Sequence, residues 1–310
     1  MERIKLAVIM PVGSDAKIRY VKDTIRSVLH YTTASRRVII LDDSGKNFGK
    51  KLKQIFPEIV VLKTSKCRGR KAWLFFTLCM GFEFAYKNYF FDVLLKMDTD
   101  ALIIGENPED DAIRCFRRHP EYGSIGTYKK DCGGERRNFF WNGRQLLLEI
   151  SDEHLFKFPS YRRGVMFLRK VFRKSQKNRY EPGEHCQGGA HFISRECIAK
   201  LRKNKLLSRR EIWWSQQEDD VIFGLLMYST GLKHGDLATG SRPMGVRWRG
   251  LPCSPGELLA KGKKVVHSTR FYKNLSEDKI RSFFRKQRLN KIHGSGRHVK
   301  RFIDGGRTRN

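Results

Sequence analysis

Short apolar runs alternate with longer amphipathic stretches over the first third of the chain, and this alternation limits the fold more than any other feature. The apolar runs have the length and composition of buried strands, at 4–12, 37–45, 58–63 and 92–97. Stretches of helical period separate them, at 20–31, 46–56 and 71–87. Such a series predicts an α/β fold with a doubly wound, mostly parallel sheet flanked by helices.

Length and cysteine content narrow the class of protein further. The 310 residues, 40% of them hydrophobic, are enough for one large core. No stretch reaches the roughly 18 to 20 apolar residues of a membrane-spanning helix. The first apolar run stops at Pro11 without a small-residue cleavage site, which indicates a strand and not a signal peptide. The seven cysteines include no Cys-x-x-Cys pair, so we expect a reduced, cytoplasmic protein.

The formal net charge of +31 is concentrated in two blocks. Residues 157–180 carry nine Lys/Arg and no acid, and residues 281–310 carry ten Lys/Arg against one acid, so both favour polyanions. Within the first block the apolar side chains recur at helical spacing, with the cations on other faces: Tyr161, Val165, Leu168 and Phe172. This pattern is typical of a helix lying peripherally on an anionic membrane, and the alternative is that the stripe packs on the core.

Two pairs of aspartates end two of the predicted strands. Asp42 and Asp43 close the second strand, and Asp98 and Asp100 close the fourth, so both pairs should lie at the edge where such sheets bind ligands. On an extended strand, side chains two residues apart point the same way, which predicts that Asp98 and Asp100 share a divalent cation, Mn²⁺ or Mg²⁺. For the first pair, in "DDSG", an ordinary turn is the alternative.

These segments resemble a known family. "VIMPV" (8–12), "VIILDDSG" (38–45) and "KMDTD" (96–100) are similar to the nucleotide-sugar half of metal-dependent glycosyltransferases of the GT-A fold, especially the family-2 and Fringe-like β-1,3 enzymes. The resemblance includes four further segments and covers roughly residues 4–270: "RGRKAWLFFTLCMGFEFAYK" (68–87), which precedes the "DTD" strand, "QGGAHFIS" (187–194), "EDDVIFGLLMYSTGLK" (218–233) and "VVHSTR" (265–270). It implies transfer of a hexose from a nucleoside-diphosphate sugar, with a UDP-sugar expected first, to a hydroxyl of a glycan, a glycolipid or another acceptor.

The resemblance also implies roles for individual residues. The metal ligands would be Asp98, Asp100 and His267. The residues that contact the nucleotide sugar would be Pro11, Asp42 or Asp43, Asp98, Gly188 and Gly189. Lys71 or Arg70, at the start of a helix, could supply the cation that stabilises the leaving diphosphate, and an ordinary solvated lysine is the alternative for Lys71. Trp213, Trp214 and Trp248 are candidate sugar platforms or plain core.

An inverting transfer needs a carboxylate that takes the proton of the acceptor hydroxyl. Aligning the acids by the following Val-x-x-Gly selects Asp220, which we prefer, and aligning them by the Glu-Asp pair of family 2 selects Asp219. The alternative is a helix N-terminus enriched in acids because of the helix dipole.

The predicted organisation is a GT-A-like domain over 1–275, followed by a basic helix and flexible tail over 276–310, with the tail expected to begin at Gly294. Within the domain, residues 1–130 would form the nucleotide-sugar half and residues 131–275 the acceptor half. Two departures stand out: Val12-Gly13-Ser14 replaces the polar pair that family 2 usually has after its first strand, and Met244 replaces the glutamine of processive synthases. Two rival classes remain. A nucleic-acid or polyanion binder leaves the clustered acids unexplained, and a metal-dependent nucleotidyltransferase would need a glycine-rich loop after its first strand.

Overall fold

The structure is a computed structural model that describes the backbone of residues 1–65 and 67–303, and the side chains as far as residue 290. The predicted alternation of strands and helices is present in the order β1 (Glu2–Val12), α1 (Ile18–Tyr31), β2 (Arg36–Asp42), α2 (Phe48–Ile55), β3 (Val60–Lys63), α3 (Ala72–Asn88) and β4 (Tyr89–Met97). The middle of the chain continues with β5 (Leu102–Ile103), α4 (Pro108–Arg118), β6 (Tyr122–Gly126), α5 (Phe140–Glu149), α6 (Asp152–Lys157), η1 (Pro159–Tyr161) and α7 (Arg162–Lys177). The last part contains β7 (Ala190–Ser194), α8 (Arg195–Lys203), η2 (Arg210–Ile212), α9 (Asp219–Tyr228), β8 (Lys233–Asp236), β9 (Met244–Val246), α10 (Pro255–Ala260), β10 (Val265–His267), β11 (Phe271–Tyr272), β12 (Leu275–Ser276) and α11 (Glu277–Ile303).

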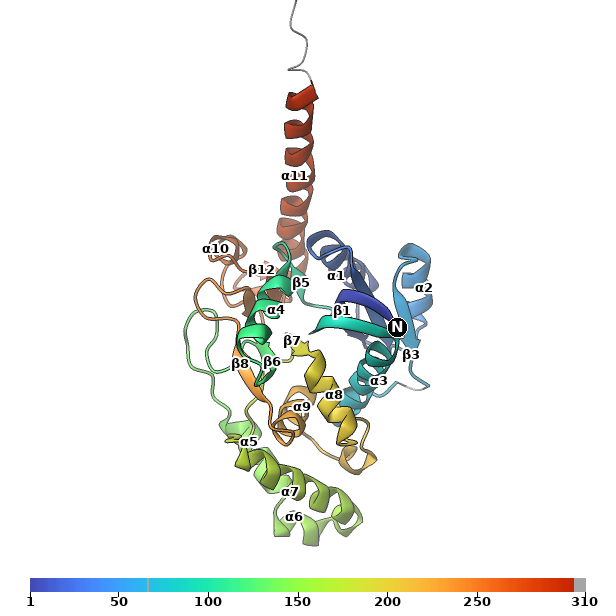
Figure 1. Cartoon of the computed structure of the whole chain (residues 1–310), viewed down its shortest axis with the longest axis vertical. Helices are drawn as coiled ribbons and strands as arrows, with labels where there is room; N and C mark the ends of the chain where they lie inside the picture. Colours follow the sequence, from blue (N-terminus) through green and yellow to red (C-terminus); the bar gives the residue numbers. More distant parts are fainter. Residues whose placement is uncertain (66, 304–310) are drawn as a thin grey trace, which may run out of the picture.

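A seven-stranded sheet in the order β3-β2-β1-β4-β7-β6-β8 forms the centre of the molecule. The first four strands are parallel, β7 runs antiparallel to both β4 and β6, and β6 and β8 are parallel. Helices flank this sheet (Figure 1). The predicted α/β class, with a doubly wound and mostly parallel sheet, is therefore confirmed, and β7 is the reversed strand.

A second, three-stranded sheet in the order β5-β10-β9 brings distant segments to the end of β4. β10 pairs antiparallel with β5, where Val266 lies opposite Leu102. Because β5 begins just after the Asp98–Asp100 turn, this pairing carries His267 to that turn.

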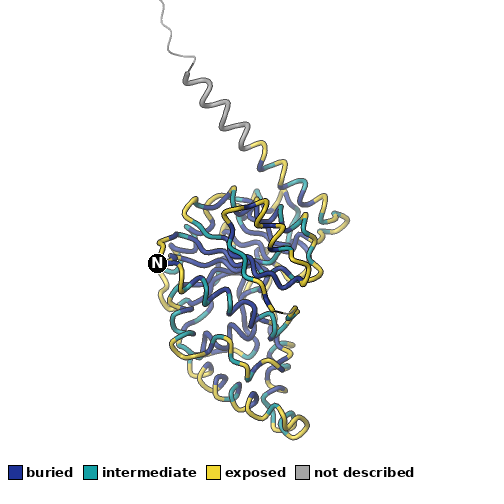
Figure 2. Tube along the Cα trace, turned by 90° about the vertical axis from the view of Figure 1, so that its right-hand side faces the viewer, coloured by how far each residue is buried: buried dark blue, intermediate teal, exposed yellow. Residues whose placement is uncertain are grey.

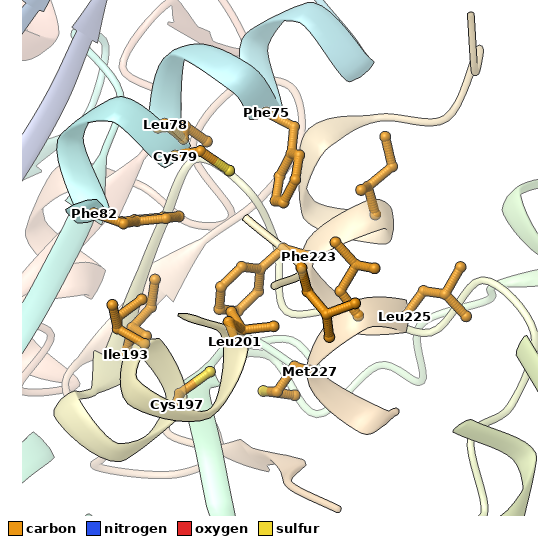
Figure 3. Close-up of a cluster of buried hydrophobic side chains, with 14 of the residues drawn as sticks. Phe75, Leu78, Cys79, Phe82, Ile193, Cys197, Leu201, Phe223, Leu225 and Met227 are labelled. Carbon is orange, nitrogen blue, oxygen red and sulfur yellow. The ribbon is translucent and has the colours of Figure 1, made fainter. Parts of the chain in front are cut away.

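Alternating side chains of the central strands fill two cores, one on each face of the sheet. On β1, Val8 and Met10 belong to the core that α1, α2 and α4 cover, whereas Ile9 belongs to the core beneath α3, α8 and α9. Figure 3 shows part of this second core, where side chains of α3, β7, α8 and α9 meet. The rings of Phe82 on α3 and Phe223 on α9 lie 5.9 Å apart. Figure 2 shows the resulting buried interior.

The amphipathic stripe of the first basic block packs on this second core. Val165, Leu168 and Phe172 of α7 are all buried there. The alternative in which the stripe packs on the core is therefore correct, and the stripe is not available to a membrane. Among the described helices, none is both long and apolar enough to cross a bilayer.

The second basic block begins with two arginines that are engaged inside the protein. Arg281 and Arg288 of α11 are buried and pair with the buried Asp23 of α1, at 3.2 and 2.5 Å. These two cations stabilise the attachment of α11 to the domain and are not offered to a polyanion. The helix extends past Gly294, where the tail was expected to begin, to Ile303, and residues 304–310 lie outside the described part of the chain.

Candidate active site

The carboxylates of Asp98 and Asp100 and the imidazole of His267 converge at the end of β4. Each offers one ligand atom, and these atoms all lie within 4.8 Å of one another. The two aspartates lie in the turn that follows β4 and not on the strand itself, so the turn brings them together, and not the strand alternation expected from the sequence. The Asp98 side chain is 32% exposed, which leaves this group accessible from solvent.

The orientation of His267 fits a metal ligand. Its Nδ1 lies 2.7 Å from the backbone carbonyl of Arg247, which can only accept, so Nδ1 carries a proton and donates it there. Nε2 faces Asp100 Oδ1 at 3.2 Å. A histidine ligand that is fixed through its other nitrogen in this way is the usual arrangement at metal sites. Two carboxylates and one imidazole form a donor set that suits Mn²⁺.

The Asp100 carboxylate is strongly held in its ionised form. Burial disfavours its charge, but His267, Arg270 and Ser268 outweigh burial and hold the pKa of Asp100 well below its usual range. Ser268 Oγ donates to Oδ2 at 2.9 Å, and Arg270 Nε lies 2.7 Å from the same oxygen. Asp100 in turn raises the pKa of His267, although burial acts in the opposite direction. Asp100 is therefore an ionised carboxylate, the form in which it can serve as a metal ligand.

Gly188 and Gly189 lie in the turn directly before β7 and allow two candidate groups to approach the backbone there. A Cβ atom at Gly189 would lie 2.1 Å from Nδ1 of His267, and one at Gly188 would lie 2.7 Å from Oδ2 of Asp220. Both distances are shorter than any real contact, so a side chain at either position would displace its neighbour. The backbone carbonyl of Gly189 also accepts a hydrogen bond from the Asp98 N–H at 2.9 Å. Glycine is therefore required here for steric reasons.

Lys96 connects the metal-ligand cluster to the acids of α9. Its Nζ, fully buried on β4, donates to Asp98 Oδ1 at 2.8 Å and lies 3.6 Å from Asp219 Oδ2. It also donates to the carbonyl of Gly188. Burial disfavours its charge, but Asp98 and Asp219 outweigh burial and raise the pKa of Lys96 above its ordinary value. A fixed ammonium thus lies between the two groups of carboxylates.

The two candidate bases have different surroundings, although both are buried in the first turn of α9. Burial raises the pKa of Asp219 to about 7, and the carboxylates of Asp220 and Asp98 contribute, while Lys96 acts in the opposite direction. Asp220 accepts a hydrogen bond from the Val221 N–H at 2.9 Å, and its Oδ2 lies 3.6 Å from Nε2 of His185.

The first aspartate pair holds loops together. Asp42 accepts hydrogen bonds from the N–H groups of Ser44 and Gly49, at 3.1 and 2.8 Å. Asp43 accepts from Thr64 Oγ1 at 2.7 Å and from the Arg68 N–H at 2.9 Å. These bonds explain the burial of both carboxylates without a ligand, as the turn alternative requires. Pro11 lies on β1, where it pairs with Leu41 of β2.

Lys71, Trp213 and Trp214 lie near the start of α9, whereas Trp248 follows β9. Lys71 precedes α3, and its Nζ donates to Oε1 of Gln216 at 2.7 Å. Trp214 is buried and stacks on Tyr161 with ring centroids 5.2 Å apart, so it is a core residue. Trp213 and Trp248 remain 47% and 68% exposed.

Sequence reasoning missed three groups that act on the cluster. Lys96 could have been recognised from the sequence, because a charged side chain within an otherwise apolar strand needs a buried partner. Ser268 and Arg270 follow His267 within the quoted motif, but only the folded chain shows that both contact Asp100.

Comparisons with known proteins give weak similarities only. No protein-family model matches the chain, and no curated protein matches it in sequence. Among solved structures it is similar to the mannosyltransferase PcManGT from Pyrobaculum calidifontis in complex with GDP-Man and Mn²⁺, at 11% identity and a TM-score of 0.39, over 76% of this chain and 56% of that one. It is also similar to the WbbM bifunctional glycosyltransferase without ligand, at 10% identity and a TM-score of 0.45, over 89% of this chain and 49% of that one.

A third similarity is to GalNAc-T7 with UDP, GalNAc and Mn²⁺, at 13% identity and a TM-score of 0.30, over 39% of this chain and 22% of that one. Each match spans less than two thirds of the other protein. Similarities of this strength do not assign a family or an activity to this chain.

Proposed function

We propose that the protein is a metal-dependent glycosyltransferase that moves a hexose from a nucleoside-diphosphate sugar, with UDP-sugars as the first expectation, to a hydroxyl acceptor with inversion. One observation carries the proposal: a cation-binding group, Asp98, Asp100 and His267, lies beside a pair of buried carboxylates, Asp219 and Asp220, and Lys96 connects them. Transfer from a diphosphate leaving group needs both parts, a positive charge for the leaving group and a base for the acceptor.

The bonds of the reaction follow from this arrangement. The acceptor oxygen forms a bond to the anomeric carbon, and the bond from that carbon to the phosphate oxygen breaks with its electron pair. The hydroxyl proton passes to Asp219 or Asp220. A pKa of about 7 places Asp219 in the range that suits a base near neutral pH.

Asp98, Asp100 and His267 would hold the metal ion. A bound Mn²⁺ would supply positive charge that offsets the charge developing on the diphosphate. Lys71 and Arg270 are further cations near these groups, and Lys71 is oriented by Gln216. Lys96 lies between Asp98 and Asp219 and pairs with both carboxylates.

Calorimetric titration tests the proposal directly. UDP, GDP and their sugars are titrated into the protein with Mn²⁺ and with a chelator, and binding of at least one of them should require Mn²⁺. Slow Mn²⁺-dependent hydrolysis of the same nucleotide sugar, without an added acceptor, should follow. Nucleotide binding that does not respond to the metal would contradict the proposal.

A further inference from the structure

Helix α3 has apolar side chains on two opposite faces. Phe75, Leu78, Cys79 and Phe82 form the inner face and point into the core toward α9 (Figure 3). The outer face carries a second apolar stripe at the spacing i, i+3, i+7 and i+11: Trp73, Phe76, Met80 and Phe84. A helix that is apolar all round is normally covered on all sides. The outer stripe is only partly covered by the described residues, since Trp73, Met80 and Phe84 are half-buried.

The outer stripe lines an open groove. The groove has a volume of about 950 Å³, and its other walls include Leu62 of β3 and Trp213 after η2. The rings of Trp73 and Trp213 lie 5.8 Å apart and form one wall together. An open apolar groove of this size is within the range of small-molecule sites, which commonly reach several hundred Å³. We call it the α3 groove.

Charged groups mark the rim of the α3 groove. Arg68 lies in the loop before α3, Arg210 lies on η2, and Lys87 lies near the far end of the helix. The acid on the rim, Glu83, is paired with Arg202 at 3.0 Å and with Lys87 at 3.4 Å. The rim therefore favours a negatively charged group.

The α3 groove begins beside the candidate active site. Lys71, which precedes α3, reaches Gln216, and that residue stands two positions before Glu218 at the start of α9. Arg68, on the groove rim, donates its backbone N–H to Asp43 at the end of β2. A ligand lying along the outer stripe would thus have one end near the acids of α9.

We propose that the α3 groove binds the hydrocarbon chain of a lipid-linked acceptor, in which a phosphate joins the chain to the group that carries the accepting hydroxyl. The assignment rests on the proposed function and names its acceptor class. The 17 residues of α3 give a track of about 25 Å at 1.5 Å per residue, which suits an extended chain. The apolar walls favour hydrocarbon over a peptide, whose backbone would need hydrogen-bond partners. The cations at the rim complement the phosphate.

Binding of simple amphiphiles tests the groove. Dodecyl phosphate, below its critical micelle concentration, should bind at least tenfold more tightly than butyl phosphate, because its eight additional methylenes leave water when they enter the apolar groove. Met80→Glu and Phe84→Glu should each remove this advantage. Met166→Glu, at an exposed methionine of α7, is the matched control and should keep it. Equal affinity of the wild-type protein for the two phosphates would overturn the proposal.

A second measurement does not depend on the folding of those variants. Bromine quenches tryptophan fluorescence on contact, so 12-bromododecyl phosphate should quench the wild-type protein. Replacing both groove tryptophans, Trp73→Phe with Trp213→Phe, should remove the larger part of the quenching, whereas Trp248→Phe, at an exposed tryptophan outside the groove, should not. Quenching that survives the double substitution unchanged would place the ligand elsewhere.

Transfer assays separate this inference from the proposed function. With the donor that calorimetry selects, dodecyl phosphate-linked glucose should show a KM at least tenfold lower than butyl phosphate-linked glucose. Met80→Glu should raise the first KM and leave Mn²⁺-dependent nucleotide binding unchanged. If nucleotide binding requires Mn²⁺ but KM does not depend on the length of the acceptor's hydrocarbon chain, only the proposal for the α3 groove is overturned. Absence of Mn²⁺-dependent nucleotide binding overturns the proposed function, and the acceptor assignment with it.

Discussion

Arg281 of α11 donates a hydrogen bond from Nη2 to the backbone carbonyl of Thr99 at 2.8 Å, so the C-terminal helix holds the middle of the Asp98–Asp100 turn. Thr24 of α1 donates to the same carbonyl at 2.8 Å. The Arg281 side chain is buried, and its Nε also pairs with Glu277 at 2.8 Å. Two helices from opposite ends of the chain thus fix the turn that carries the proposed metal ligands.

Replacing this arginine should weaken both the fold and the metal site. Arg281→Met leaves part of the negative charge on Asp23 and Glu277 uncompensated, and we expect a loss of about 3 kcal/mol in the free energy of unfolding, measured by urea denaturation. Mn²⁺ affinity should fall roughly tenfold, as for other residues that support metal ligands. Arg285→Met is the control, because Arg285 is exposed and contacts Asp23 only at 3.6 Å. Similar losses in both variants would contradict the special role of Arg281.

The metal site itself depends on Asp100. Asp100→Asn removes the negative charge that faces His267 and Arg270 but keeps the side-chain volume, so we expect a folded protein that has lost Mn²⁺-dependent nucleotide binding. Calorimetry with Mn²⁺ alone and with nucleotide measures both effects. Asp278→Asn, at an exposed position on α11, should behave as wild type. An Asp100→Asn protein with wild-type Mn²⁺ affinity would remove Asp100 from the ligand set.

The catalytic base is decided by a pair of matched variants. Asp219→Asn and Asp220→Asn each remove one carboxylate from the first turn of α9. The variant that lacks the base should lose turnover by about 10²- to 10⁴-fold with little change in donor affinity. The other should retain most of its activity. Steady-state kinetics with saturating donor distinguishes them, and two equally active variants would exclude both residues.

The pKa of Asp219 also predicts how stability depends on pH. Its folded pKa of about 7 lies above the value of about 3.9 expected in the unfolded chain, so the folded state binds an extra proton between these two values. The stabilisation is complete below about pH 4 and is lost as the pH rises through 7. Between about pH 5 and pH 8 the metal-free wild-type protein should therefore lose more unfolding free energy than Asp219→Asn. Equal losses in urea denaturation would show that the carboxyl does not titrate in this range.

We expect the exposed cations of α7 to bind an anionic membrane surface. Because the apolar stripe of α7 is buried, this contact would be purely electrostatic, and the protein would be a peripheral membrane protein. The cations concerned are Lys170, Arg173, Lys174 and Lys177. Each should contribute about 1 kcal/mol near such a surface, so replacing all four with glutamine should abolish sedimentation with anionic vesicles. Donor hydrolysis should not change.

The control for this experiment replaces four exposed lysines elsewhere with glutamine, namely Lys50, Lys51, Lys203 and Lys205. This variant should still sediment with anionic vesicles, and neither protein should bind neutral vesicles. Wild-type protein that ignores anionic vesicles at physiological salt would show that these charges serve a different anion.

Local periodicity was enough to predict the strands and helices and, with them, the edge of the sheet that carries the acids. The apolar runs that end at Asp42 and at Asp98 predicted two strands with their carboxyl ends together, and both strands are present. The position of an aspartate after a strand, however, does not reveal what its carboxylate contacts. Asp42 and Asp43 hold loops, whereas Asp98 and Asp100 face His267, and both arrangements look alike in a sequence.

Which side chains meet could be seen only in the folded chain. The pairing of β10 with β5 brings His267 to Asp100, and the packing of α9 against the sheet brings Asp219 to Lys96. Such contacts join residues more than a hundred positions apart, and no local pattern encodes them. The same holds for the stripe of α7, where one periodicity suits a membrane surface or a protein core equally well. The stripe is buried because α9 lies opposite it in the folded protein. The periodicity of a helix face does not show what covers that face.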